Sequence, residues 1–161
     1  MEFTPSLFTK IVLLQDVDVT PIIGSTVVLA IDEAYTIGKS IAVLINETII
    51  GHLDSLATKV VWRHIRSGTK LTAEVYPNLG NWRNKAWYSI MTHSFEVGIK
   101  VRFCDLNRED GKLLLAHIAK KKLNSFPGVA PCNCPEDLKL MVRPIKDEND
   151  VLSLLLSPHM I

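Results

Sequence analysis

The sequence predicts one mostly β domain (α+β), a small barrel or strongly bent sheet of six or seven short strands with one inserted helix. Two observations predict it. Segments rich in β-branched residues recur between Gly, Pro and Asn, and one stretch among them changes to helical spacing. An apolar content of 47% is ample for a core and excludes a disordered chain. The strand pattern ends near Asp105, so we expect residues 1–105 to form the barrel and residues 106–161 an α-helical C-terminal extension packed on it.

Four strands are expected first, over residues 8–15, 25–31, 40–45 and 48–50. Pro21 and Gly24 punctuate the first connection. Asn46 and Glu47 predict a tight hairpin between the last two strands, because Asn tolerates positive φ at low cost.

The spacing then changes to that of an amphipathic helix, with apolar positions every three or four residues from Leu53 to Ile65. Asp54 is the expected N-cap and Gly68 the terminating residue. Strands over 69–76 and 95–103 follow, the second with the clearest alternation in the chain. Residues 87–93 are either a strand or part of the loop before it.

The C-terminal extension is expected to contain a helix over 111–123, a Pro-rich loop, a strand over 138–145 and a helix over 147–156. Its end, from Leu152 to Ile161, is strongly apolar. Either this tail docks on the barrel, or it is a short helix that inserts into a groove of a partner protein.

Charge is unevenly distributed along the chain. Residues 1–58 hold two Lys/Arg and seven Asp/Glu, a net charge of −5, whereas residues 59–102 hold eight and two, a net charge of +6. Such a basic region favours a polyanionic partner, although a solvated surface of a nearly neutral protein has the same composition.

One run of elements carries a family resemblance. It starts with the strand Ser40-Ile41-Ala42-Val43 and continues through a hairpin into Ile49-Ile50-Gly51-His52-Leu53. The predicted helix and the strand Gly68–Val75 complete it. This order, with Gly51-His52-Leu53 as its sharpest element, resembles the HIRAN domain over roughly residues 8–103. The resemblance implies a small OB-like barrel that binds single-stranded DNA, in well-studied members at a free 3′ end. The tripeptide would have a structural role.

The chain departs from that family at two places. Before the strand at Ser40, the family's Asn-Pro-Tyr-Asp-type run is replaced by residues 32–39, where Tyr35 is a possible stacking residue but Thr36 stands in place of the acidic residue. After the first strand, Asp16 and Asp18 would repel phosphate. Recognition of a 3′ end is therefore left open by the resemblance.

The candidate nucleic-acid contacts are aromatic and basic residues, since stacked bases and neutralised phosphates are what a single strand requires. They are Tyr35, Lys39, Lys59, Arg63, Arg66, Trp82, Arg83, Lys85, Trp87 and Tyr88. Residues 81–88 interleave three aromatic side chains with two cations. In the alternative interpretation Trp82 and Trp87 pack over the barrel mouth, or the loop is a hot spot for a protein partner.

The sequence shows no catalytic motif, and we expect neither an enzyme nor a cofactor. Cys132 and Cys134 lack the four-ligand spacing of a zinc site, so no metal is expected. Three cysteines without framework spacing, no signal peptide and no membrane-spanning apolar run predict an intracellular protein of nucleus or cytoplasm. The expected function is thus that of a nucleic-acid-binding accessory module, with single-stranded DNA favoured. A protein-interaction module and a small enzyme of unrecognised type are the alternatives.

Overall fold

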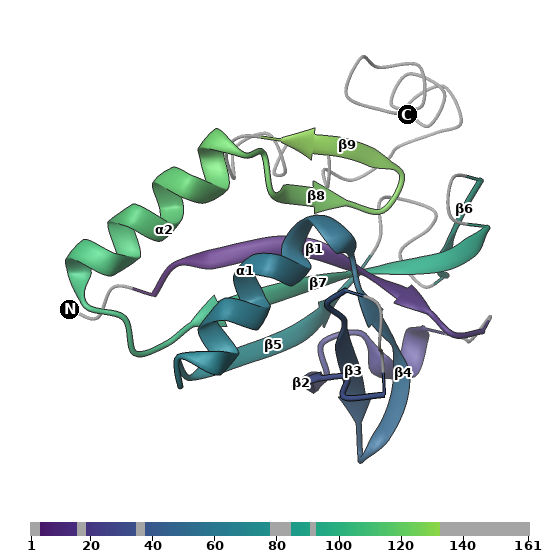
Figure 1. Cartoon of the computed structure of the whole chain (residues 1–161). Coiled ribbons are helices and arrows are strands. Elements are labelled where there is room, and N and C mark those ends of the chain that lie inside the picture. The colour runs from purple at the N-terminus through teal and green to yellow at the C-terminus, as the bar shows by residue number, and fades with distance from the viewer. Residues whose placement is uncertain (1–3, 16–18, 35–37, 78–84, 91–92, 133–161) are drawn as a thin grey trace.

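Six antiparallel strands close into a barrel, which confirms the predicted fold class of a mostly β, OB-like barrel (Figure 1). The computed structural model describes residues 4–15, 19–34, 38–77, 85–90 and 93–132. The barrel strands are β1 (Ser6–Leu13), β2 (Thr26–Ile31), β3 (Ile41–Ile45), β4 (Thr48–Leu53), β5 (Leu71–Tyr76) and β7 (Ser94–Phe103). Their order is β1-β4-β3-β2-β5-β7, and β7 pairs again with β1 to close the ring.

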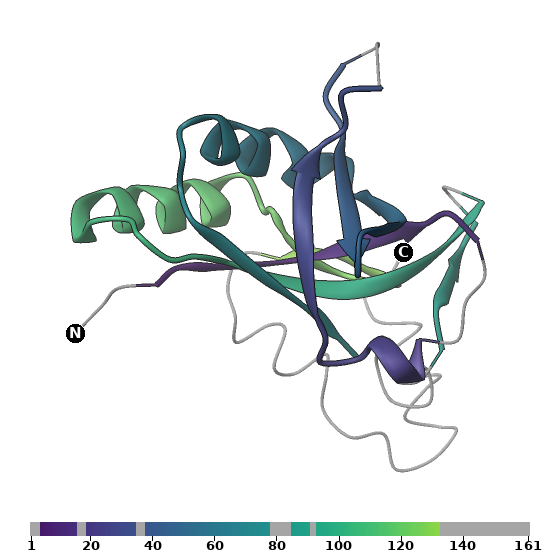
Figure 2. The same cartoon turned by 90° about the horizontal axis from the view of Figure 1, so that it is seen from below.

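Two short elements complete this part of the chain. A 3₁₀ turn, Thr20–Ile22, lies between β1 and β2, and β6 (Trp87–Ser89) pairs with the beginning of β7. Strands β2 and β3 cross the long strands β1 and β7 at a steep angle (Figure 2), as the tilt of strands in a small barrel requires.

The connections follow a Greek key, in which β2, β3 and β4 are consecutive and β5 returns to lie beside β2. The β3–β4 hairpin turns at Asn46 and Glu47, with φ of 49° and 67°. Positive φ at both turn residues is the geometry that matches the twist of a two-residue hairpin, as the sequence predicted.

Helix α1 (Ser55–Arg66) forms the long connection between β4 and β5. The carboxylate of its N-cap, Asp54, accepts a hydrogen bond from the Leu56 amide at 3.3 Å. The chain leaves the helix through Gly68, two residues after its last residue, whose φ of +81° a residue with a side chain would adopt only under strain. Both ends agree with the sequence prediction.

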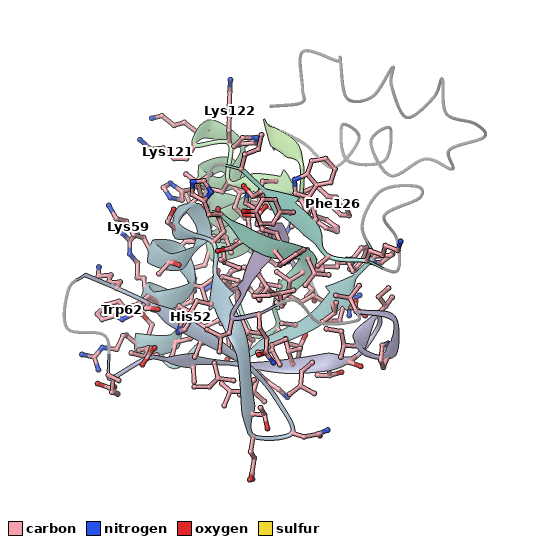
Figure 3. All side chains as sticks on the ribbon, turned by 90° about the vertical axis from the view of Figure 1, so that its right-hand side faces the viewer. His52, Lys59, Trp62, Lys121, Lys122 and Phe126 are labelled. Carbon is pink, nitrogen blue, oxygen red and sulfur yellow. The ribbon has the colours of Figure 1, made fainter. Side chains whose placement is uncertain are left out.

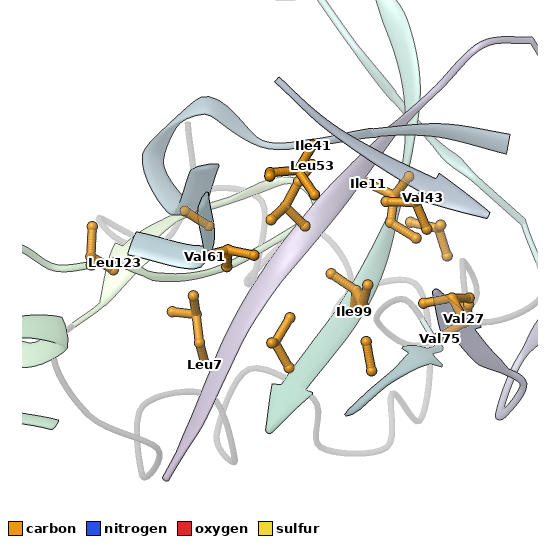
Figure 4. Packing of buried hydrophobic residues seen from close by; sticks show 14 of the residues in the cluster. Leu7, Ile11, Val27, Ile41, Val43, Leu53, Val61, Val75, Ile99 and Leu123 are labelled. Carbon is orange, nitrogen blue, oxygen red and sulfur yellow. The ribbon is translucent and has the colours of Figure 1, made fainter. Parts of the chain in front are cut away.

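The core lies inside the barrel and continues beneath α1 (Figure 4). Alternate residues of each strand point inward, for example Leu7 and Ile11 of β1 and Ile99 and Val101 of β7, all of which are buried. Helix α1 adds Ala57, Val60 and Val61 to the same hydrophobic cluster. One face of α1 is thereby fixed to the barrel, and its opposite face is left to solvent.

The chain continues into α2 (Arg108–Lys120), which begins three residues before the predicted Gly111 because Asn107 caps it, accepting from the Asp110 amide at 2.8 Å. Leu114, Ile118 and Leu123 join the hydrophobic cluster of the barrel. The predicted Pro-rich loop is wrong in part, because residues 124–132 form a hairpin of β8 (Asn124–Phe126) and β9 (Val129–Cys132).

This hairpin is held by tertiary contacts that its sequence does not reveal. The side chain of Asn124 accepts a hydrogen bond from the Phe8 amide at 3.1 Å, and the buried ring of Phe126 lies against Gly98 of β7. The strand predicted over 138–145, the helix over 147–156 and the apolar tail lie outside the described residues.

Candidate nucleic-acid interface

The outward face of α1 is basic. Lys59, Trp62, Arg63 and Arg66 recur at intervals of three and four residues and therefore share one side of the helix. The three cations are exposed and Trp62 is half-buried. No Asp or Glu occurs within α1. Figure 3 shows Lys59 and Trp62 projecting from the same side of the molecule.

Trp62 is flanked by two cations. The Lys39 ammonium lies 4.4 Å from the centre of its ring system, and the Arg66 guanidinium lies 5.0 Å away. Such contacts stabilise an exposed pair by about 0.5–1 kcal/mol, so a ligand can displace either cation at low cost. Sequence reasoning overlooked Trp62. The available signal was its position three residues after Lys59 and four before Arg66.

These cations have no carboxylate partner among the residues that the structure describes. The ion pairs found there join Lys10 to Glu96 and Arg102 to Glu74, and the histidine contact joins His52 to Asp32. Lys39, Lys59, Arg63 and Arg66 are in none of them. We define these four cations together with Trp62 as the α1 face.

A hydrogen bond across β3 holds the loop that carries Lys39. His52 Nε2 of β4 lies 2.9 Å from Asp32 Oδ2, just beyond β2. The small side chain of Ala42, the β3 residue opposite His52, leaves room for this contact. Asp32 also accepts from the Ala34 amide at 3.1 Å. The His52 hydrogen bond is the main reason why the pKa of Asp32 lies below its ordinary value.

Gly51 and Leu53, on either side of His52, face the barrel interior. A Cβ on Gly51 would lie 2.3 Å from the Val12 carbonyl oxygen and 2.9 Å from Ile11 Cγ2. Leu53 is buried in the core. In the Gly51-His52-Leu53 motif, therefore, the glycine permits close approach of β1 and the histidine anchors the 32–40 loop.

His64 lies on the inner side of α1. Its Nδ1 is 3.1 Å from the Thr69 hydroxyl, and its ring packs edge-on against Phe103 with centroids 4.9 Å apart. Burial, followed by the nearby charge of Arg63, lowers the pKa of His64.

The barrel wall opens beside the end of α1. Strands β2 and β5 pair only through Thr26 opposite Glu74 and Val27 opposite Ala73, the shortest pairing between adjacent barrel strands. Beyond that point the two strands separate around a hollow of about 390 Å³. We call it the seam hollow. Its walls are Thr26, Val27, Val28, Leu29, Ile65, Gly68, Thr69, Leu71, Thr72 and Ala73.

A second group of aromatic and basic side chains lies on the outer side of β1, β5 and β7. The Lys100 ammonium is 5.4 Å from the centre of the Phe8 ring and 5.9 Å from that of Tyr76. Arg102 pairs with Glu74 at 3.1 Å. The pKa of Lys100 is lowered, first by burial and then by Arg102.

The predicted nucleic-acid contacts around β6 lie far from the α1 face. Strand β6 pairs with residues 94–96 at the start of β7, whereas α1 contacts Phe103 at its end, and seven extended residues span roughly 23 Å. Figures 1 and 2 likewise show β6 beyond the end of β7 that is remote from α1. Those predicted contact residues that the structure describes therefore do not form one continuous surface.

The β6 residues themselves differ in exposure. Trp87 is half-buried, with its ring against Gly128, so close that a Cβ there would lie 2.8 Å from it. Tyr88 is 47% exposed and packs edge-on against Phe95, and Lys85 is exposed. Tyr35, Trp82 and Arg83 lie outside the described residues.

Among the described residues, no three His, Cys, Asp or Glu side chains converge as metal ligands would. No helix in the described ranges is long and apolar enough to cross a membrane.

Comparisons with protein-family models, curated proteins and solved structures found no match, so the HIRAN resemblance stays a prediction from the residues.

Proposed function

We propose that the protein is a nucleic-acid-binding accessory module that takes single-stranded DNA on the α1 face, without catalysis, inside the cell. The observation that supports this most is the combination of four cations lacking carboxylate partners in the described structure with one accessible indole. A cation that makes no internal ion pair can neutralise a phosphate without first losing a salt bridge. Release of counterions from the strand then favours binding.

Trp62 favours a single strand over a duplex. An indole stacks on the face of a base, and in a duplex that face is covered by the neighbouring base pairs. Each base stacked on an aromatic side chain contributes about 1–3 kcal/mol, irrespective of its identity. The Lys39 and Arg66 charges at 4.4 and 5.0 Å from the ring would lie close to the phosphates of a stacked nucleotide.

The resemblance to HIRAN domains supports the same proposal. In this interpretation Gly51, His52 and Leu53 are structural, and the 32–40 loop anchored by His52 presents Lys39 to the strand. Tyr35, in the same loop, is the candidate for contact with the terminal nucleotide.

A protein-interaction module is the second candidate, favoured by the exposed apolar side chains near β6. Tyr88 is 47% exposed and Ile90 is 78% exposed, next to a strand that pairs on one side only within the described residues. Exposed aromatic and aliphatic residues at a sheet edge suit a protein partner. Such an interface would respond little to salt, because burial of apolar surface rather than ion release stabilises it.

The test is a titration of fluorescent oligothymidine of about 10 nucleotides, a length within the site sizes of OB folds, followed by anisotropy at two salt concentrations. A 3′-phosphorylated copy and a duplex of equal length serve as comparisons. Salt-sensitive binding that prefers the single strand is expected, and loss of binding on 3′ phosphorylation would add end recognition. Absence of binding at low salt would overturn the proposal and direct attention to protein partners of Tyr88 and Ile90.

A further inference from the structure

The seam hollow lies between two groups of cations. On one side Arg66 of the α1 face directly precedes Ser67 and Gly68, and Gly68 lines the hollow. On the other side a smaller depression of about 60 Å³ adjoins it, since the two share Thr26, Thr72 and Ala73. That smaller depression is lined by Lys100, Arg102 and Glu74, and Glu74 pairs with Arg102 at 3.1 Å. Its two cations outnumber its one carboxylate, so its net charge is positive. An anionic chain leaving the α1 face would therefore reach a second positively charged group by crossing the hollow.

The walls of the hollow are suited to an uncharged, flat group. None of its lining residues is charged, and most are aliphatic, such as Val27, Leu29 and Ile65. Thr26, Thr69 and Thr72 supply hydroxyl groups that can both donate and accept hydrogen bonds. At about 390 Å³ the hollow lies at the lower end of the range for sites that bind small organic groups, about 300–1,000 Å³.

The open wall also leaves main-chain groups available. From Val28 to Ile31, β2 pairs with β3 on one side. On its other side, which faces β5, this part of β2 has no strand partner among the described residues. The edges of nucleobases carry donors and acceptors that can pair with such main-chain groups. A base bound here would have apolar contact on its face and hydrogen-bond partners along its edge.

We propose that the seam hollow binds one unpaired nucleobase of the strand held on the α1 face, with the following phosphates directed toward Lys100. This inference rests on the proposed function and extends it to a second, separate subsite. The aromatic rings of Phe8 and Tyr76, which flank Lys100 at 5.4 and 5.9 Å, would lie near the next nucleotide. An extended peptide pairing with β2 is the competing occupant. The cations on both sides of the hollow favour the nucleic acid.

Cys104 provides a probe of this path that requires no substitution. Its Sγ lies 3.6 Å from the Thr72 hydroxyl, and Thr72 lines both depressions. The thiol is half-buried, without a disulfide. Trypsin places Cys104 in fragment 103–108 and the other two cysteines in fragment 123–139, so mass spectrometry measures their alkylation separately.

We expect oligothymidine at ten times its dissociation constant to slow alkylation of Cys104 about tenfold, since only about one molecule in eleven is then free. The rate at the other cysteines serves as the reference. If the strand binds and Cys104 reacts at an unchanged rate, the strand stays on the α1 face and the seam hollow is not its path. That outcome overturns this inference and leaves the proposed function intact. It is also the outcome expected if a peptide is the true occupant.

A pair of variants gives an independent test. Thr26→Glu places a carboxylate at the junction of the two depressions, whereas Thr48→Glu makes the same change at another exposed threonine that begins a strand. Thr26→Glu should weaken oligothymidine binding about fivefold, the size of one like-charge contact near the surface, and Thr48→Glu should not. Equal affinities of the two folded variants would contradict the subsite. Absence of binding by the unaltered protein would overturn both proposals.

Discussion

Removing two cations from the α1 face should change how steeply DNA binding depends on salt. Lys59→Gln combined with Arg63→Gln removes two exposed charges that have no carboxylate partner among the described residues. Neither side chain is part of the hydrophobic core, so the variant should fold. The matched control is Lys121→Gln with Lys122→Gln, which removes the same charge from exposed positions at the end of α2 (Figure 3).

The expected magnitude follows from the number of phosphates that the α1 face can neutralise. For single strands the logarithm of the association constant falls by about 0.7 per neutralised phosphate for each tenfold rise in salt. Four cations give a slope of about −2.8, and the loss of two reduces it to about −1.4. Between 50 and 200 mM salt, the unaltered protein should lose about 50-fold in affinity and the α1 variant about sevenfold.

Anisotropy titrations of labelled oligothymidine at several salt concentrations measure these slopes. If Lys100 and other cations contribute, both slopes become steeper, but the difference between them stays near 1.4. Identical slopes for the unaltered protein and the α1 variant would refute the assignment of the strand to α1. So would a lower slope in the α2 control alone.

Three further results are expected. Trp62→Leu should weaken single-strand binding by about 1–3 kcal/mol, the contribution of one stacked base. Because Trp62 also packs against the core, urea unfolding first checks that the variant is folded under the titration conditions; an unaltered affinity of the folded variant would exclude Trp62 from the interface. Gly51→Ala should destabilise the protein by at least about 1–3 kcal/mol in denaturant unfolding, because its Cβ would lie 2.3 Å from the Val12 carbonyl oxygen. A variant as stable as the unaltered protein would show that β1 and β4 are less closely packed. The pKa of His64 is lowered on folding, so its contribution to stability is complete above about pH 6.5 and declines as the pH falls through the folded value. An NMR titration of the His64 ring should give a pKa below 6.5, and an ordinary or raised value would contradict its burial beside Phe103.

Much of the barrel follows from local sequence patterns. Enrichment in β-branched and aliphatic residues between turn residues, with clear alternation in β5 and β7, predicted five of the six barrel strands over most of their length. The sixth, β4, was predicted as its first three residues. The helical spacing between Leu53 and Ile65, with Asp54 as the N-cap and Gly68 after the last turn, placed both ends of α1. These signals are local, because burial of one face imposes the period of each element on its own residues.

The β8–β9 hairpin could not be predicted in the same way. Its strands are short, and their pairing is stabilised by contacts with distant residues, such as the hydrogen bond from the Phe8 amide to Asn124 and the packing of Phe126 against Gly98. A three-residue strand has too few residues to display a period. Only the presence of β1 and β7 beneath it makes the segment a hairpin.

The candidate site, like the fold, was predicted from the sequence only in part. Composition alone determined that the middle of the chain is basic and that a polyanion is a plausible partner, since net charge does not depend on folding. Sequence also placed Lys59, Arg63 and Arg66 on one side of a helix.

Proximity between segments was decided only by the tertiary structure. It brought Lys39 to Trp62, held by the His52–Asp32 hydrogen bond, and it separated Trp87 and Tyr88 from α1 by the length of β7. It also opened the seam hollow, because β2 and β5 pair at only two positions before diverging around the end of α1. Such distances depend on how the barrel closes, and closure joins residues too far apart in the chain for any local pattern to record.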